Sequence, residues 1–175
     1  TGFDLVEWQL RVAAGEPLPA TQDRISVTGH AIEVRLVAED PAAGWLPSVG
    51  TLGHFDVTGD GIRVDTGFRA GSTVSADFDS LLAKVIAHDT SRAAAAARLA
   101  RALGGARITG VRTNAASLSA ILAEPDFLAG ATPTAYLAEH PDVLAPPGLP
   151  DADQVAHLAA AVISADLAAR QASPL

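Results

Sequence analysis

The sequence predicts an α+β domain, because segments with the two-residue period of strands alternate with segments of helical character. The clearest strand lies within residues 25–37, where apolar and polar side chains alternate. The clearest helix spans residues 90–103 and ends at Gly104 and Gly105. Apolar residues make up 49% of the 175 residues, which is enough for a buried core. No internal repeat is visible, so a single α+β unit with extensions is expected.

The first elements are a helix and a half-buried strand. Within residues 1–14, Leu5, Trp8 and Val12 recur at helical spacing, and Gly15 offers a left-handed end. In the strand over 25–37, two sets of side chains point to opposite faces: Ile32, Val34 and Leu36 on one, Glu33 and Arg35 on the other.

Two shorter strands are predicted at residues 51–57 and 61–65. Gly59-Asp60-Gly61 lies between them, and this composition is typical of a β-hairpin turn. We therefore expect the two strands to pair with each other.

The next segments predict a strand–helix–strand unit. Residues 84–88 and 107–111 are the strands, and the helix between them begins at a cap provided by Thr90 or Ser91. Thr113 or Asn114 can cap a further helix, which Pro125 ends. Its apolar face consists of Leu118, Ile121 and Leu122.

The C-terminal part changes in composition. Residues 141–150 are rich in proline and predict a stiff linker. Residues 151–171 predict an amphipathic helix, with apolar side chains on one stripe at Val155, Leu158, Val162, Ile163 and Leu167.

Composition excludes several classes of function. The net charge is −8, with 12 basic residues scattered along the chain, so we expect no nucleic-acid partner. There is no cysteine, which excludes disulfides, thiolate zinc sites and a cysteine nucleophile. No apolar run is long enough to cross a bilayer and no secretory signal is visible, so we expect no membrane contact. The chain also has no methionine, and we therefore expect it to be part of a longer protein.

Complete catalytic motifs are missing from the sequence. There is no phosphate-binding loop, no dinucleotide fingerprint and no His-Glu-x-x-His pair among the five histidines. We expect no metal site, and any chemistry here needs a second part of the protein.

The strongest candidate for chemistry is the pair Glu33 and Arg35. They are two residues apart on a strand, so their side chains share one face and can pair. A guanidinium offers a planar fork of donors that fits a carboxylate or bicarbonate, and it can stabilise negative charge that develops on a bound oxygen. The alternative interpretation is a solvated strand face with a weak surface ion pair.

A second group of charges surrounds the predicted turns. Arg63 and Asp65 share a strand face, and Asp79 precedes the only lysine, Lys84. These side chains can be ordinary exposed charges or a polar contact across a subunit or domain boundary. Nothing near Lys84 in sequence activates it as a nucleophile.

Several motifs in register resemble the C-terminal domain of biotin carboxylase. They are Gly29-His30-Ala31-Ile32-Glu33-x-Arg35-x-x-Ala38-Glu39-Asp40-Pro41, Trp45-Leu46-Pro47-Ser48-x-Gly50, Arg63-Val64-Asp65, Asp79-Ser80-x-x-x-Lys84, Gly110-x-x-Thr113-Asn114 and Tyr136-Leu137. The opening Thr1-Gly2-Phe3-Asp4-Leu5 resembles the segment that leaves the ATP-grasp domain of that enzyme. The resemblance covers residues 1 to about 140. It implies the mostly antiparallel sheet with packed helices of that family.

The resemblance also implies an activity and roles for residues. The family uses ATP, Mg²⁺ and bicarbonate to carboxylate biotin on a carrier protein. Arg35 matches the arginine that contacts bicarbonate and the ureido oxygen of biotin, so it is our catalytic and substrate-binding candidate, with Glu33 as an orienting residue. Arg63 and Asp79 match interface or scaffold positions, and Thr134 matches a nucleotide-proximal position. The aromatic residue of the family before Arg63 is replaced by Gly59-Asp60-Gly61.

The resemblance implies three regions. Residues 1–22 match the end of the ATP-grasp region and a linker, residues 23–140 match the C-terminal domain, and residues 141–175 lead to a missing downstream domain. The glycine-rich lid, the nucleotide lysines and the magnesium carboxylates of the family have no counterpart here. We therefore expect an inactive fragment that binds no cofactor tightly.

The extension after residue 140 resembles the α subunits of acyl-CoA carboxylases, in which a linking domain and a biotin carrier follow. Expected partners are the N-terminal and ATP-grasp domains, the biotin carboxyl carrier domain, a carboxyltransferase subunit and a second copy of this domain in a homodimer. The expected location is cytoplasmic. Two alternatives stay open: a non-catalytic assembly or dimerisation module, and the same domain from a pyruvate or urea carboxylase.

Overall fold

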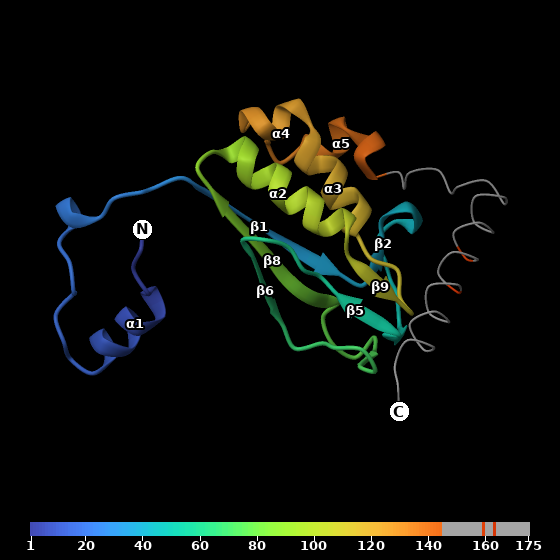
Figure 1. Ribbon diagram of the computed structural model, residues 1–175, viewed down its shortest axis with the longest axis horizontal. Coiled ribbons are helices and arrows are strands. Elements are labelled where there is room, and N and C mark those ends of the chain that lie inside the picture. Colours follow the sequence, from blue (N-terminus) through green and yellow to red (C-terminus); the bar gives the residue numbers. More distant parts are fainter. Residues whose placement is uncertain (145–158, 160–162, 164–175) are drawn as a thin grey trace.

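The structure is a computed structural model that describes residues 1–144, 159 and 163 (Figure 1). The helices are α1 (Leu5–Ala13), α2 (Arg92–Gly104), α3 (Ala115–Ala123), α4 (Pro125–Ala129) and α5 (Tyr136–Glu139), with short 3-10 helices η1 (Gln22–Arg24), η2 (Pro41–Ala43) and η3 (Pro141–Leu144). The strands are β1 (His30–Val37), β2 (Glu39–Asp40), β3 (Leu46–Pro47), β4 (Gly50–Thr51), β5 (His54–Asp56), β6 (Ile62–Thr66), β7 (Thr73–Val74), β8 (Leu81–Asp89) and β9 (Arg107–Thr109). The predicted linker over 141–150 begins as the helix η3, in which Val143 is buried, and its remaining residues lie outside the described part of the chain. The predicted helix over 151–171 also lies outside it, apart from residues 159 and 163.

A three-stranded antiparallel sheet in the order β1-β8-β6 forms the centre of the fold. Helices α2 to α5 lie over one face of this sheet (Figure 1). The alternation in β1 creates the buried layer, because Ile32, Val34 and Leu36 enter the core while the residues between them stay exposed. The predicted α+β class with a mostly antiparallel sheet is therefore confirmed.

Helix α2 is the main cover of the sheet. Its first turn is capped by the Ser91 hydroxyl, which accepts a hydrogen bond of 3.2 Å from the Ala94 N–H. Its buried face is made largely of small side chains, which allow the helix to lie close to the strands: Ala95, Ala96, Leu99, Ala102 and Leu103. The predicted helix is confirmed, and Ser91 is the cap.

The predicted hairpin between residues 51–57 and 61–65 is wrong. A turn does form at Gly59–Gly61, since the Ile62 N–H donates to the Gly59 carbonyl over 3.2 Å and Gly61 has φ +67°. However, β5 pairs with β9, while β6 pairs with β8, so the two strands diverge into different sheets. The turn chemistry is local, whereas the choice of partner is set by burial against the rest of the domain.

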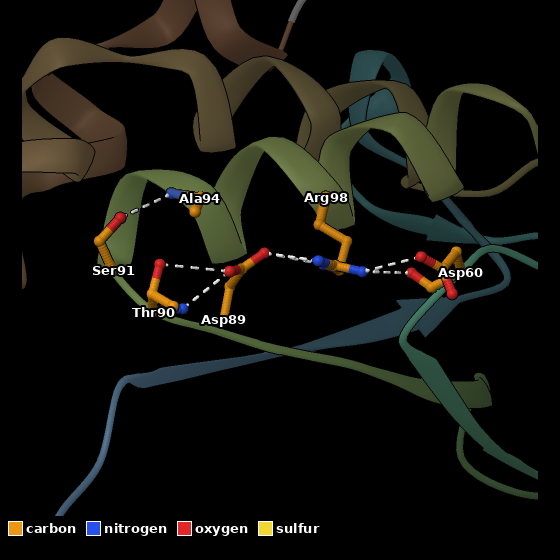
Figure 2. Close-up of polar contacts among 6 residues, drawn as sticks. All are labelled: Asp60, Asp89, Thr90, Ser91, Ala94 and Arg98. Atoms are coloured by element: carbon orange, nitrogen blue, oxygen red, sulfur yellow. Dashed lines mark hydrogen bonds and ion pairs between the residues drawn. The ribbon is translucent and has the colours of Figure 1, made fainter.

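Arg98 of α2 fastens this turn to the sheet (Figure 2). Its guanidinium donates to the Asp60 carbonyl over 2.8 Å and to Asp89 Oδ2, at the end of β8, over 3.0 and 2.7 Å. The Thr90 N–H, followed by Arg98, lowers the pKa of the Asp89 carboxyl by hydrogen bonding to its charged form. One arginine therefore links the helix, the end of β8 and the turn before β6.

The predicted strand–helix–strand unit is present as three elements, but its strands do not share a sheet. Strand β9 pairs with β5, whereas β8 pairs with β1 and β6. A second, smaller core lies beneath this end of the molecule and consists of Ala38, Leu52, Val74 and Leu82. The small sheets therefore enclose a core of their own.

Helix α1 contributes no buried residue and stands apart from the sheet (Figure 1). The predicted helix is confirmed, with Asp4 as its cap through a 3.0 Å hydrogen bond from the Glu7 N–H. Its apolar side chains, including Leu5 and Leu10, are exposed.

The last described segments are held by a cluster around His140. Its Nδ1 donates to the Tyr136 carbonyl over 3.0 Å, its Nε2 lies 3.3 Å from Asp126 Oδ2, and its ring stacks on that of Tyr136. The Tyr136 carbonyl, and then the charge of Asp126, raise the pKa of His140 above its usual value. When it is protonated, the imidazole forms an ion pair with Asp126 and links the end of α5 to α4.

We expect Arg98→Ala to lower the melting temperature of the chain more than Arg63→Ala. Arg98 and its partner Asp89 are mostly buried, with side-chain exposures of 25% and 19%, whereas Arg63 is 73% exposed. Because the pKa of Asp89 is lowered in the folded state, the deficit of Arg98→Ala should shrink as the pH falls through that pKa. Thermal unfolding followed by circular dichroism measures the melting temperatures of both variants and their dependence on pH. An equal fall in melting temperature for the two variants would contradict the assigned role of Arg98.

We expect His140→Gln to destabilise the chain most in acid. A raised pKa means that the native state binds the proton more tightly, so this stabilisation is complete below about pH 6.5 and is lost as the pH rises through the higher folded pKa. Urea unfolding of the native chain and of His140→Gln at pH 6 and pH 9 measures the difference. A deficit that grows towards pH 9 would contradict the imidazolium link.

Candidate functional site

The open face of the sheet carries the predicted site. Because α2 and the core occupy the other face, Glu33 and Arg35 of β1 point away from the helices and are exposed. The prediction that these two side chains share one face is confirmed by the burial pattern of β1. Strand β1 lies at the edge of the sheet, next to β8.

Arg35 has a cation as its cross-strand neighbour. Lys84 of β8 lies directly opposite Arg35, and Asp65 of β6 lies opposite Lys84 on the far side. Directly opposed like charges repel at the distance of a strand pair. Within residues 1–144, the structure shows no hydrogen bond or ion pair of the Arg35 side chain. The arrangement leaves the donors of Arg35 available for an anion.

Glu33 is not ion-paired with Arg35 in the described part of the chain. Its cross-strand row contains Ile86 and then Arg63. No direct contact between Glu33 and Arg35 in the described residues supports the orienting role of Glu33, which stays a prediction.

Arg63 and Asp65 form a bidentate ion pair on β6. Arg63 Nε and Nη2 donate to the two carboxylate oxygens of Asp65, each over 2.8 Å. This hydrogen bonding lowers the pKa of Asp65 and raises that of Arg63. The open face thus carries one satisfied ion pair beside the opposed cations Arg35 and Lys84.

The backbone of Arg35 is held by a residue that the sequence argument treated as a helix cap. Asn114 occupies the cap position of α3, but its side chain makes no cap hydrogen bond. Instead, Nδ2 donates to the Arg35 carbonyl over 3.1 Å, and Oδ1 accepts from the Val37 N–H over 3.0 Å. No signal in the sequence distinguishes this long-range contact from a cap.

Asp79 and Thr134 occupy different parts of the molecule. The Asp79 carboxylate accepts a 2.8 Å hydrogen bond from the Leu81 N–H at the start of β8. Thr134 is exposed in the turn before α5, which belongs to the helical layer (Figure 1). Arg35 faces away from that layer, so the described residues do not bring Thr134 and Arg35 together. The interface or scaffold role of Arg63 and Asp79, and the nucleotide role of Thr134, stay predictions.

The described residues show neither a metal-ligand cluster nor a membrane-spanning helix. Among them, no group of three or more acidic or histidine side chains is arranged to hold a metal ion. No described helix combines the length and apolar character needed to span a bilayer.

The relatives of the chain are carboxylases. The chain is 38% identical over 162 residues to the mitochondrial methylcrotonoyl-CoA carboxylase subunit alpha of Dictyostelium discoideum, which covers 91% of this chain and 23% of that protein. It is 43% identical over 141 residues to a biotin carboxylase of Halalkalibacterium halodurans, which covers 80% of this chain and 31% of that protein. The chain thus spans about a quarter to a third of the length of these relatives.

The fold is similar to that of solved structures. The biotin carboxylase domain dimer of 2-oxoglutarate carboxylase from Hydrogenobacter thermophilus, solved with MgADP, ADP and bicarbonate, matches with a TM-score of 0.79 and 41% identity. The match covers 83% of this chain and 32% of that one. The model of the biotin carboxylase C-terminal domain family matches residues 33–139, from within β1 to the end of α5. With sequence, fold and strand-borne arginine in agreement, the chain belongs to the biotin carboxylase C-terminal domain family.

Proposed function

We propose that this chain supplies one wall of the bicarbonate and biotin site of a biotin-dependent carboxylase, with Arg35 as the residue that meets both substrates. The observation that carries the proposal is the exposed guanidinium of Arg35, which has no partner among the described residues and lies opposite another cation, Lys84. A bound anion relieves the repulsion between these two charges. The proposal is also consistent with bicarbonate in the solved relative.

Arg35 would act through its donors. Its planar fork can donate two parallel hydrogen bonds to bicarbonate, which fixes the orientation of that substrate. When a proton leaves the ureido group of biotin, negative charge develops on the ureido oxygen, and the same guanidinium can stabilise it. A fixed positive group gains most from charge that appears only in the transition state, so the main effect falls on turnover.

We assign the binding of ATP and Mg²⁺ to another part of the enzyme, apart from the candidate nucleotide contact at Thr134. The sequence has no phosphate-binding loop, and residues 1–144 contain no cluster of metal ligands. We therefore propose that the ATP-grasp part of the longer enzyme holds the magnesium nucleotide. Thr134 remains a candidate contact on the nucleotide side, and Glu33 a candidate orienting group for Arg35.

The finer identity that we propose is the α subunit of an acyl-CoA carboxylase. The match to a methylcrotonoyl-CoA carboxylase subunit alpha extends over 91% of this chain. The proposed partners are the N-terminal and ATP-grasp domains, a biotin carboxyl carrier domain, a carboxyltransferase subunit and a second copy of this domain that contacts Arg63 or Asp79. A cytoplasmic location remains a prediction.

Two alternatives keep specific support. A pyruvate carboxylase of Caenorhabditis elegans is 42% identical over 148 residues, which supports the same domain in an enzyme with a different final acceptor. The exposed charged face of the sheet supports a pure assembly module, in which Arg35 makes a subunit contact and no substrate contact. The residues that follow this domain in the longer protein distinguish the first alternative, and the experiment below distinguishes the second.

We expect Arg35→Ala in the full-length carboxylase to lower the rate of biotin carboxylation on the order of a hundredfold, as loss of an oriented charge donor does. Arg35→Lys should recover little of it, because an ammonium cannot donate the two parallel bonds. Fixation of labelled bicarbonate measures the rate. Arg101→Ala is the control, since this exposed arginine of α2 lies on the helical side of the sheet.

Near-normal fixation by Arg35→Ala would overturn the substrate role. If that variant also lost its oligomeric state on size-exclusion chromatography, the assembly alternative would replace it.

A further inference from the structure

We propose that Asn114 is the positioning residue for Arg35, which deepens the function proposed above and rests on it. No described side chain holds the Arg35 guanidinium, so the direction of this side chain is set by the backbone from which it projects. The backbone around Arg35 is therefore the part of the molecule that must be fixed.

Asn114 pairs with β1 as a neighbouring strand would. Its amide Nδ2 donates to the Arg35 carbonyl over 3.1 Å, and Oδ1 accepts from the Val37 N–H over 3.0 Å. Its own backbone N–H also donates to the Val37 carbonyl over 3.4 Å. Two of these hydrogen bonds hold the peptide groups on either side of Leu36, and the third holds the next peptide group, between Val37 and Ala38.

The chemistry of the contact requires an amide. The Val37 N–H needs an acceptor and the Arg35 carbonyl needs a donor, and the carboxamide offers both on one rigid plane. In the opposite orientation of the amide, Nδ2 would face the Val37 N–H, which is also a donor, and Oδ1 would face the Arg35 carbonyl oxygen, which is also an acceptor. The Asn114 side chain is 5% exposed, so water has little access to replace it.

The contact lies where β1 has no other strand beside it. Strand β1 is at the edge of the sheet, and the Arg35 and Val37 groups that Asn114 binds point outward from it. On its other side, the register with β8 is irregular at this point, because Leu36 pairs with Ala83 and Val37 pairs with Leu81. Leu82 is the extra residue, and the Thr66 hydroxyl donates to its carbonyl over 2.6 Å.

Asn114 therefore fixes the strand at the point where regular pairing stops. Leu36 is fully buried and anchors the same stretch in the core. With the peptide planes on both sides of Leu36 held, the Cα–Cβ direction of Arg35 is defined before any substrate binds. Such preorganisation matters because a misplacement of about 1 Å can cost on the order of 100-fold in rate.

The test uses Asn114→Ala and Asn114→Ser in the full-length carboxylase, with Ser119→Ala as control. Ser119 lies on the same helix, and its hydroxyl donates to the Ala100 carbonyl of α2 and not to the backbone of β1. We expect the rate of bicarbonate fixation to fall about 10- to 100-fold in Asn114→Ala, while the KM for ATP changes less than about twofold. Ser119→Ala should retain the native rate.

A double-mutant cycle separates positioning from general stability. If Asn114 acts through Arg35, adding Asn114→Ala to Arg35→Ala should lower the rate by no more than about threefold. A fall of the same size in both backgrounds overturns the inference, as does a native rate in Asn114→Ala. If both Asn114 variants fail to fold, Asn114 serves stability alone and the inference is also overturned.

Hydrogen exchange tests the contact itself on the same proteins. The Val37 amide should exchange faster in Asn114→Ala than in the native enzyme or in Ser119→Ala, because it loses its acceptor. Unchanged exchange would overturn the proposed contact. The Asn114 tests and the test of the proposed function can fail separately. Near-native bicarbonate fixation by Arg35→Ala refutes the proposed function, whatever the rates of the Asn114 variants are.

Discussion

The two-residue period of β1 is the constraint on which the rest of the structure depends. Burial of Ile32, Val34 and Leu36 against the helical layer places every intervening side chain on the opposite face. A slip of one residue would bury Glu33 and Arg35 and expose the apolar set, at the cost of unpaired charges in the core. The hydrophobic effect therefore decides on which side of the sheet the arginine lies.

The position of Arg35 on the open face of the sheet gives a candidate site in which two cations lie side by side. Arg35 and Lys84 face each other across the strand pair, and Asp65, beyond Lys84, is already engaged by Arg63. The two opposed cations favour an anionic ligand, and the described residues contain no cluster of metal ligands. In the proposed function, this domain contributes charge and orientation, and the phosphate chemistry belongs to another part of the enzyme.

The sequence was sufficient where structure follows from local pattern. The alternation of β1, the Ser91 cap of α2 and the helix that begins near Asn114 all arise from neighbours within a few residues. The hairpin at Gly59–Gly61 failed because its turn chemistry is local, but each flanking strand finds a partner elsewhere in the chain. Arg98, which holds that turn to α2, gives no sign of this contact in sequence.

In the candidate site, too, local features could be predicted from the sequence and long-range contacts could not. The position of Arg35 could be predicted, since it depends on one strand period and on resemblance. The contact of Asn114 with residues 35 and 37 could not, because the two segments lie 77 and 79 residues apart and asparagine at that position already had an explanation as a cap. The lack of an ion pair between Glu33 and Arg35 could not be predicted either, because it depends on the neighbouring strands.

A crystal structure of the full-length carboxylase with bound bicarbonate tests the central claim most directly. The account predicts two nitrogen atoms of the Arg35 guanidinium at about 2.7–2.9 Å from oxygen atoms of the anion. Bicarbonate bound elsewhere, with the Arg35 side chain in contact only with a second subunit or with solvent, would contradict it.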